Sequence, residues 1–462
     1  MQQASIPHFL RKLADELFFP IISFRTYSFG QQVMAKFRAV RIPGRRIYSL
    51  RVLARIFLQH ALALLATPAA MIARGLGYRF VCVDLSQIGS IMWLDLYLRD
   101  ITPQRIPRGR ILVCRSPLID ANAYLFDLYA AHVTFVRSSL AQAILMPFFV
   151  NPLSRVDLHR YQEPFQWAEA FGDRGSFGFK AFRAYRAVHP DPLIHLPQTD
   201  LDRGKALMDA LGVAGRPVIA LHVRDSGYYR DTDRQTRNAD IDTYLPALKK
   251  LCAEGYAVLR LGDANMQPID HLVDACGDGL IDYARSDLKS AFADIYICAT
   301  CDFFIGMSSG MLAMPIVFQK PACFINCVNA SACLGYLPKT LATFKKVRRV
   351  ADNGLVPLAD LFRPPLNRNP SAASLAAEGV YLEDNSAQEI LDTVVEFLRF
   401  DPEWTSDLQT KAVEMLGPYC HAYDAAGSFS NTILRAYADE LGEPRTPTTA
   451  RPNAGQTKET QS

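Results

Sequence analysis

Acidic residues are missing from a long amino-terminal stretch of this 462-residue chain, since none occurs between Glu16 and Asp84. The same stretch contains nine arginines and Lys36. Because the whole chain has a formal charge of only +4, the part that follows is net acidic. A basic segment on an otherwise acidic chain favours contact with an anionic surface.

The most apolar segment of this basic region is shorter than the roughly 20 residues that a membrane-spanning helix needs. Ile56 to Ala73 has 18 residues, no charge, and Gln59, His60 and Pro68 inside it. The segment begins too late for a secretory signal peptide. Three interpretations remain: an anchor in the plane of an anionic membrane, which fits best, a spanning helix, or a core helix with solvated arginines.

Nucleic-acid binding is not expected of the basic region. No basic sheet with interleaved aromatic residues and no helix-turn-helix pattern accompanies its arginines. Elsewhere the chain is typical of folded proteins, since half of its residues are apolar and 21% are charged. No repeat of the solenoid type is present.

Residues 217 to 262 follow the pattern of one βαβ unit. Val218 to Val223 and Ala257 to Leu261 are short apolar runs typical of buried parallel strands, and Tyr244 to Leu251 is typical of the helix between them. Parallel α/β sheets bind ligands at the carboxyl ends of their strands. A nucleotide is therefore expected beside the residues at these ends, which are His222, Arg224 and Asp225 after the first strand and Arg260, Gly262 and Asp263 at the second.

A further strand, Asp302 to Ile305, leads into a loop of glycine and serine and then into an apolar helix beginning near Met311. Glycines allow a ligand to approach the backbone, and free N–H groups at a helix start favour phosphate. The loop lacks the lysine of a P-loop and does not match GxGxxG, which argues against ordinary kinases, ATPases and dehydrogenases. The donor-binding residues expected here are Gly306, Ser308, Ser309 and Gly310.

These motifs occur in an order that resembles fucosyltransferase-type enzymes of the GT-B fold. The series is His222-Val223-Arg224, then Arg260 to Asp263, then Asp294 to Cys301 before the glycine and serine loop. The chain is also similar to a group of bacterial glycosyltransferases found with surface-polysaccharide genes. They share the pattern HVRDSGYY…RNADI…Y and a later segment, here Glu378 to Ile390. The resemblance covers about residues 77 to 395.

The resemblance implies an α/β, GT-B-like fold in which two Rossmann-like domains face a cleft. Strands expected at Arg79 to Leu85, Ile111 to Cys114 and Val133 to Val136, with a helix at Ile91 to Leu98, would form the first sheet. Gln87, Gly89 and Ser90 would then line the acceptor side, although Gly89 could only close a turn. The expected division is a basic, apolar helical segment over 1–76, an acceptor domain over 77–200, a nucleotide-sugar domain over 201–400, helices over 401–441 and a disordered tail over 442–462.

Three residues carry the expected chemistry. Arg224 is the strongest candidate for binding the leaving diphosphate, because its guanidinium is permanently charged, and an ion pair with Asp225 or Asp263 is the alternative. His222 projects from the same strand face and either binds the diphosphate or sugar or is a buried structural residue. Asp225 is a candidate general base, with an N-cap or an arginine-orienting carboxylate as the alternative.

The long polar loop between the two strands and a late helix add further candidates. Long ordered loops are often functional, and Arg237 and Asn238 in this loop match the family pattern, so both are expected to bind the donor. Asn385 and Glu389 are candidates for holding a ribose. Equally, Asn385 or Ser386 is the N-cap of the late helix.

No metal site is expected. Asp231-Thr232-Asp233 matches the metal-binding DxD pattern of the other major glycosyltransferase fold, but the same pattern recurs twice elsewhere in the chain. Cys298 and Cys301, with Cys323 and Cys327, have a zinc-like spacing but are expected on a helix and beside a strand. Reduced, buried cysteines are the simpler interpretation.

The sequence therefore predicts a glycosyltransferase that uses a nucleotide-sugar donor and no cofactor. Its acceptor is expected to be a glycan or lipid-linked molecule of surface-polysaccharide biosynthesis. The chain is expected in the cytoplasm, peripheral on the inner face of the cell membrane. A nucleotide-sugar epimerase of the same fold and a non-catalytic nucleotide-sugar-binding component of a polysaccharide assembly are the alternatives.

Overall fold

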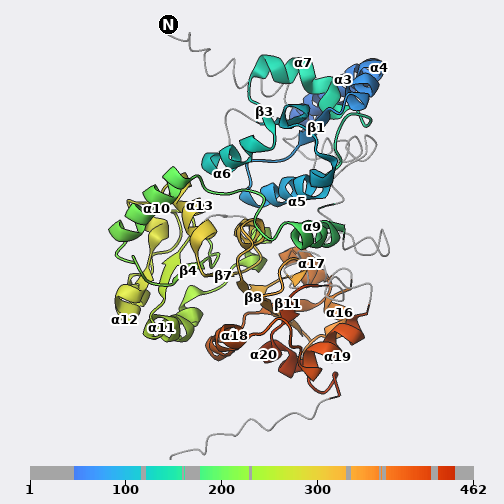
Figure 1. Cartoon of the computed structure of the whole chain (residues 1–462). Helices are drawn as coiled ribbons and strands as arrows, with labels where there is room; N and C mark the ends of the chain where they lie inside the picture. The colour runs from blue at the N-terminus through green and yellow to red at the C-terminus, as the bar shows by residue number, and fades with distance from the viewer. Residues whose placement is uncertain are drawn as a thin grey trace, which may run out of the picture.

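The chain folds into two units, each built on a parallel β-sheet, and Figure 1 shows the first unit above the second. This confirms the predicted class, α/β with two Rossmann-like units. The division at the predicted domain boundaries stays a prediction. The computed structural model describes residues 46–115, 121–158, 161, 177–227, 232–328, 334–363, 366, 371–417 and 425–442.

The first unit has three parallel strands in the order β1-β2-β3. The predicted strands and the predicted helix after the first strand are present at these positions, although β1 is shorter than expected. The bounds are β1 (Arg79–Cys82), β2 (Ile111–Cys114), β3 (Thr134–Val136), α5 (Ile91–Ile101), α6 (Ala123–Leu128), α7 (Ser139–Val150) and α9 (Phe177–Val188).

In the described residues, the second unit has seven parallel strands in the order β12-β9-β8-β7-β4-β5-β6. Strands β8, β7, β4 and β5 are buried along their whole length and are apolar except for Asn326 and Arg260, as expected of a sheet covered by helices on both faces. The strands are β4 (Val218–Leu221), β5 (Ala257–Arg260), β6 (Leu280–Ile281), β7 (Phe303–Gly306), β8 (Ala322–Cys327), β9 (Thr340–Phe344) and β12 (Ser428–Phe429).

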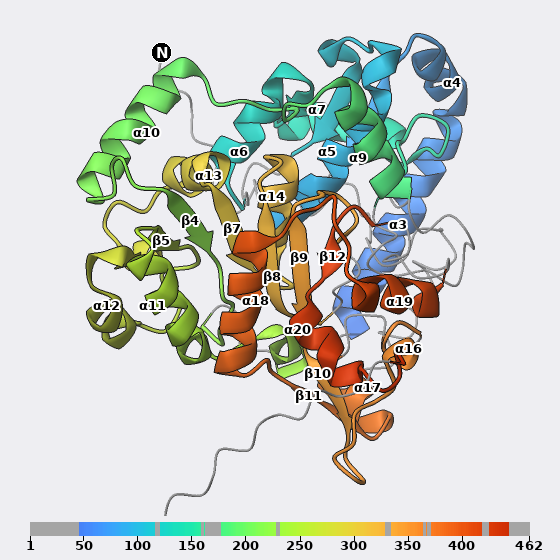
Figure 2. The same ribbon diagram turned by 60° about the horizontal axis from the view of Figure 1, so that its bottom comes forward.

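Helices flank the large sheet, and a separate antiparallel pair extends from it (Figure 2). The predicted late helices are confirmed at α18 (Ala387–Arg399) and α19 (Asp407–Leu416). The helix predicted near Met311 is instead a 3₁₀ turn, Gly310–Leu312, followed by a five-residue helix. The other elements are α10 (Gln198–Ala210), α11 (Leu245–Ala253), α12 (Asp270–Cys276), α13 (Ala291–Thr300), α14 (Ala313–Val317), β10 (Lys346–Arg349), α16 (Leu358–Leu361), β11 (Val380–Glu383), α17 (Ala372–Ala377) and α20 (Asn431–Leu434).

The strand order of the large sheet reverses between β4 and β7. From β4 the chain proceeds through β5 to β6 on one side, and then returns to β7 on the other side before continuing to β8 and β9. Open α/β sheets bind ligands outside the carboxyl ends of the strands at such a reversal. The fold thus places the preferred ligand position where His222 to Asp225 and Gly306 to Gly310 leave their strands.

A buried arginine of the first unit, Arg99, donates a hydrogen bond to the second unit. On α5, the Arg99 Nε lies 2.5 Å from Asp95 Oδ2, and both side chains are fully buried. Arg99 also donates to the Val317 carbonyl at the end of α14 (3.1 Å), and the Tyr129 hydroxyl donates to Asp95 Oδ1 (2.9 Å). A charge buried in this way needs such partners. The pair therefore ties the first unit to the helix that follows the glycine and serine loop.

A glycine contact brings the two units together beside that loop. A methyl group on Gly89 would lie 3.0 Å from Gly310 Cα, and one on Gly310 would lie 3.2 Å from the Gly89 nitrogen. Gly89 belongs to the 3₁₀ turn Ile88–Ser90 that follows β1. Its conformation requires no glycine there, so the close approach of the second unit is what favours a residue without a side chain.

At the amino-terminal end, α3 (Arg46–Leu65) and α4 (Thr67–Gly75) form a bent pair. Among the described residues, no one helix is both long and apolar enough to cross a membrane. This pair meets that criterion only when its two helices, which are inclined at 62°, are taken together. The predicted segment Ile56 to Ala73 is therefore split at Ala66.

We expect Gly89→Ala to lower the free energy of unfolding by about 1 to 3 kcal/mol. The added methyl group would press against backbone atoms of Gly310, which cannot move aside as a flexible side chain could. Gly109→Ala is the matched control: Gly109 also lies in a 3₁₀ turn, and its added methyl group would meet nothing within 4 Å. The control should change stability by less than about 0.5 kcal/mol. Equal urea midpoints for the two variants would contradict the contact between the units.

Candidate functional site

The candidate site lies at the carboxyl edge of the large sheet, where β4 meets β5 and β7. The His222 N–H donates to the Ile305 carbonyl at 2.9 Å, and the Leu261 N–H donates to the Leu221 carbonyl at 2.7 Å. Two residues further along the chain from His222 and from Ile305, the Arg224 N–H lies 3.0 Å from Met307 Sδ. These bonds bring together the three strand ends from which most of the predicted donor-binding residues leave.

The two serines of the loop after β7 have different surroundings. The Ser308 hydroxyl accepts a hydrogen bond from the Val328 N–H at 3.1 Å, so it links the loop to the end of β8. The Ser309 Oγ is buried and has no hydrogen-bond partner among the described residues. Accepting the bond from Val328 leaves the Ser308 O–H group able to donate, so either serine can donate to a ligand. Gly310 follows directly and faces Gly89 of the first unit.

His222 is a buried, neutral imidazole. Its side chain is 9% exposed, and burial lowers its pKa from 6.5 to about 4. Nδ1 lies 3.2 Å from the Leu261 carbonyl. A carbonyl only accepts hydrogen bonds, so the proton is on Nδ1 and Nε2 carries a lone pair. His222 can therefore accept a hydrogen bond from a hydroxyl group, but it adds no positive charge at neutral pH.

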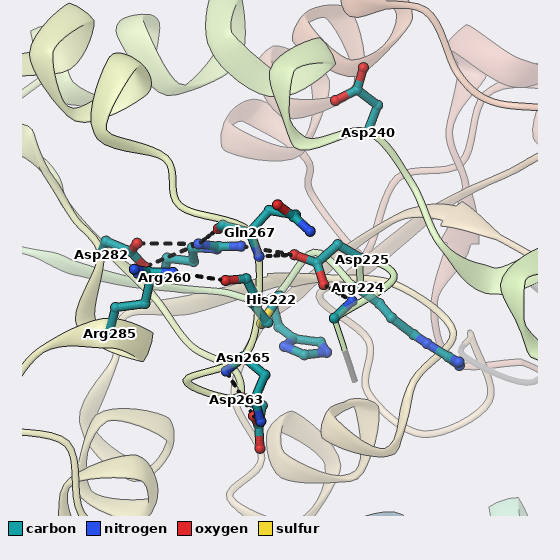
Figure 3. A network of polar contacts seen from close by, with 12 residues as sticks. His222, Arg224, Asp225, Asp240, Arg260, Asp263, Asn265, Gln267, Asp282 and Arg285 are labelled. Carbon is teal, nitrogen blue, oxygen red and sulfur yellow. Dashed lines mark hydrogen bonds and ion pairs between the residues drawn. The ribbon is translucent and has the colours of Figure 1, made fainter. Parts of the chain in front are cut away.

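Asp225 is held by a network centred on Arg260. Asp225 Oδ2 accepts from Arg260 (3.3 Å) and from the Gln267 N–H (2.8 Å), while Oδ1 accepts from the Gly227 N–H (2.8 Å). These contacts match the alternative of an arginine-orienting carboxylate, but the arginine is Arg260. Figure 3 shows the Arg224 side chain pointing away from this network.

Arg260 itself is fully buried at the end of β5. Besides Asp225, it donates to the Gln267 carbonyl (2.7 Å) and to Asp282 Oδ1 (3.2 Å), as Figure 3 shows. Burial raises the pKa of Asp282, and the nearby guanidinium opposes that rise. The sequence motifs include Arg260 but do not predict that it binds two carboxylates, because its burial depends on how three loops fold around it.

Arg224 occupies the position that the prediction requires, but it does not make the expected alternative ion pairs. The Asp225 carboxylate faces Arg260, and the Asp263 carboxylate accepts from the N–H and the side-chain amide of Asn265. Arg224 is 5% exposed, and its carbonyl accepts from the Ala239 N–H at 2.9 Å. The long loop after β4 therefore returns to Arg224 before the next helix begins.

Asn238 lies at the end of this loop, beside a lysine that sequence reasoning missed. The Asn238 carbonyl accepts from Lys345 Nζ, whereas its side-chain oxygen is buried without a hydrogen-bond partner among the described residues. Lys345 directly follows β9, is 5% exposed, and pairs with Asp384 at 2.6 Å. The sequence feature that could have indicated this residue is a lysine that directly follows an apolar strand. Arg237 ends the 3₁₀ segment that precedes Asn238.

Part of the loop lies outside the described residues. Tyr228 to Asp231 are not described, and neither are the side chains of Thr232 and Asp233, so the DxD pattern falls outside the described side chains. In the described part of the chain, no group of three histidine, cysteine or carboxylate side chains is placed to hold a metal ion. The four cysteines with zinc-like spacing are buried on α13, at its end, and on β8.

The late helix α18 begins with the capping arrangement that was one of the two predicted alternatives. Ser386 is the N-cap and forms a capping box with Glu389. Asn385 is 1% exposed and joins strands, since it accepts from the Asn326 N–H (3.0 Å) and the Thr343 hydroxyl (2.8 Å). Glu389 also pairs with Lys346 at 2.9 Å. Both side chains thus have structural partners.

The remaining predicted residues lie on two turns. On the acceptor side, Gln87 is exposed and donates to Asp84 Oδ2 (3.3 Å), and Ser90 is 4% exposed at the start of α5. After β5, Gly262 and Asp263 begin the turn that carries Asn265. Gly262 has a φ of +156°, and a methyl group there would lie 1.9 Å from Met266 Sδ, so the turn requires glycine.

The buried state of His222 has a consequence for stability. The pKa of His222 is about 4 in the folded chain and 6.5 in the unfolded chain, so the unfolded chain binds the proton at the higher pH. The stability that depends on neutral His222 is therefore lost as the pH falls from 6.5 to about 4. Between about pH 7.5 and about pH 5, the free energy of unfolding should fall by about 2 kcal/mol more in the wild type than in His222→Asn. Asparagine keeps a donor for the Leu261 carbonyl. Urea unfolding measures the difference. The control is His195→Asn, at an exposed histidine, and its stability should depend on pH as that of the wild type does.

The Asp225 network generates a second expectation, which separates a structural role from a general base. Asp225→Asn should lower the free energy of unfolding by about 2 to 4 kcal/mol, because buried Arg260 loses one of its two carboxylates. Asp263→Asn, on an exposed turn, should cost less than about 1 kcal/mol. Chemical denaturation of the two variants gives the comparison. Wild-type stability of Asp225→Asn would remove the structural role assigned to this carboxylate.

Comparisons with known proteins found similarity only among solved structures. No protein-family model matches the chain, and no curated protein matches it. The glycosyl transferase family 9 structure from Veillonella parvula is 10% identical, with a TM-score of 0.42, over 58% of this chain and 86% of that one. ADP-heptose lipopolysaccharide heptosyltransferase II of E. coli is 13% identical, with a TM-score of 0.40, over 70% of this chain and 98% of that one.

Proposed function

We propose that this protein is a glycosyltransferase that moves a sugar from a nucleotide-sugar donor to a glycan or lipid-linked acceptor in surface-polysaccharide synthesis. One observation carries the proposal. The ligand edge of the large sheet, at the reversal between β4 and β7, lies against the turn after β1 of the first unit through Gly310 and Gly89. A donor bound at this edge would have its reacting end beside the other unit.

The donor diphosphate would be bound by groups from β4 and β7. Arg224 supplies the permanent positive charge, and the buried Ser309 hydroxyl and the N–H groups around Gly310 supply neutral donors. As the bond between the anomeric carbon and the diphosphate oxygen breaks, the nucleoside diphosphate leaves with the electron pair. Positive charge fixed beside the leaving group stabilises the negative charge that develops there. We therefore propose a metal-independent reaction.

His222 would position a hydroxyl group rather than neutralise phosphate. Its Nε2 lone pair accepts a hydrogen bond, and a pKa of about 4 makes it a weak base. Asp225 accepts from Arg260 and from two backbone N–H groups. The acceptor hydroxyl forms the new bond to the anomeric carbon and releases its proton to water in the same reaction.

Lys345 and Asn238 would add further contacts to the donor. Lys345 Nζ already bonds the Asn238 carbonyl and Asp384, which fixes both residues at the same sheet edge. The buried Asn238 side-chain oxygen would accept a hydrogen bond from a ribose or sugar hydroxyl. These residues add polar recognition to the charge that Arg224 provides.

The test begins with binding of GDP, UDP, ADP, CMP and dTDP, measured by thermal shift and then by calorimetry. For the nucleotide that binds, Arg224→Ala should weaken the affinity by about 2 kcal/mol, which is about 30-fold, because a charge-assisted hydrogen bond is lost. Arg224→Lys should recover part of the loss, because it restores the charge without the fork. Arg363→Ala, at an exposed arginine paired with Asp360, is the control and should bind as the wild type does.

Product analysis with the matching nucleotide sugar separates the proposed reaction from its alternatives. Transfer of the sugar to an acceptor supports a glycosyltransferase, a changed sugar that stays on the nucleotide indicates an epimerase, and binding without any product indicates a non-catalytic component. The same assay in EDTA should keep its rate within about twofold. Wild-type affinity of Arg224→Ala would place the diphosphate elsewhere.

A further inference from the structure

The described surface has one concentration of exposed apolar side chains, and it lies on α3, α4 and α7. Of 18 large hydrophobic residues that are exposed, 12 lie between Leu50 and Leu153. Figure 1 shows these three helices gathered at the end of the molecule away from the large sheet. We call this surface the α3–α4–α7 face. Its most exposed members are Leu64, Leu65, Ile72, Leu140 and Ile144.

The helix pair is fixed to the protein along its opposite side. Leu53, Ile56, Ala63 and Ala70 are buried, and Ala63 packs in one cluster with residues of α7. At the bend, the Asn151 amide donates to the Ala63 carbonyl (2.7 Å) and to the Thr67 hydroxyl (3.0 Å). The pair is thus a docked part of the first unit.

The outward side of the helix pair has the composition of a surface covered by something other than water. Ile56 to Ala73 contains no charged residue, whereas a solvated helix face normally carries charged and polar side chains. Leu65 is 79% exposed and Ile72 is 65% exposed. Contiguous apolar surface of this kind marks an interaction site in proteins that are otherwise soluble.

Arginine side chains lie beside the α4 end of the face. The Arg79 guanidinium donates to the Arg74 carbonyl at the end of α4, and the Arg110 side chain approaches Gly77 in the same turn. No acidic residue occurs between Glu16 and Asp84 to balance them. A second copy of the chain placed symmetrically on this face would bring like charges together. An anionic lipid surface would instead attract them.

We propose that the α3–α4–α7 face docks in the plane of an anionic lipid bilayer, with its leucines and isoleucines in the acyl boundary and the arginines at the headgroups. The contact with α7 and the hydrogen bonds from Asn151 hold the bent pair against the first unit. The inference goes beyond the proposed sugar transfer and does not depend on it, because it uses no residue of the candidate site.

The experiment is co-sedimentation of the full chain with phosphatidylcholine vesicles, with and without about 30% phosphatidylglycerol. We expect binding at least about tenfold stronger to the anionic vesicles, with partial loss in high salt. The triple variant Leu65→Gln, Ile72→Gln, Leu140→Gln should lower binding at least about tenfold, because three side chains leave the acyl boundary. The control is Val188→Gln with Val350→Gln, at residues 73% and 66% exposed elsewhere on the surface.

A second variant, Arg74→Gln with Arg110→Gln, tests the charges without touching the apolar side chains. It should lower binding to anionic vesicles about tenfold and leave binding to neutral vesicles unchanged. Thermal melting of every variant shows whether it is folded. Wild-type binding by the triple variant, or no binding by the wild type, overturns the proposal. Concentration-dependent dimers lost in the triple variant would assign the face to a second copy, and resistance to alkaline carbonate would indicate a spanning segment.

Discussion

The backbone ladder between β4 and β7 is the constraint on which the candidate site depends. The His222 N–H bonds the Ile305 carbonyl, and the strands on either side of the pair are buried along their length. All strands of this sheet run the same way, so every polar residue that follows a strand emerges at one edge. The ladder thereby fixes His222 and Arg224 beside the loop of Ser308 and Ser309, although these pairs are far apart in the chain.

Burial of Arg260 explains how the site separates its charges. A guanidinium without exposure needs compensating oxygens, and Asp225 and Asp282 provide them together with the Gln267 carbonyl. The carboxylate next to Arg224 in sequence is thus used by a different arginine. Arg224 points away from the pair, so its positive charge is not opposed by its own neighbour. The buried ion network of Arg260 thus does not include Arg224, which we propose contacts the phosphate.

The sequence predicts the sheet well and the long-range contacts poorly. Apolar runs such as Val218 to Val223 and Ala257 to Leu261 become strands because a buried parallel strand requires little beyond apolar side chains. The contact of Gly89 with Gly310 joins two units, and no local pattern specifies it. The partner of Asp225 is likewise set by loops that fold over the end of β5. Lys345 was missed for the same reason, since a lysine after a strand is informative only once Asn238 is seen beside it.

The two proposals meet in the first unit. The Tyr78 N–H bonds the Ala73 carbonyl of α4, and β1 begins at the next residue, so the helix pair and the first sheet are directly connected. The turn after β1 then carries Gly89 to Gly310 of the donor loop. A bilayer that covered the α3–α4–α7 face would thus be linked to the candidate site through a single short strand. Strand β1 thus has the proposed membrane surface at its amino-terminal end and the turn that contacts the proposed donor site after its carboxyl end.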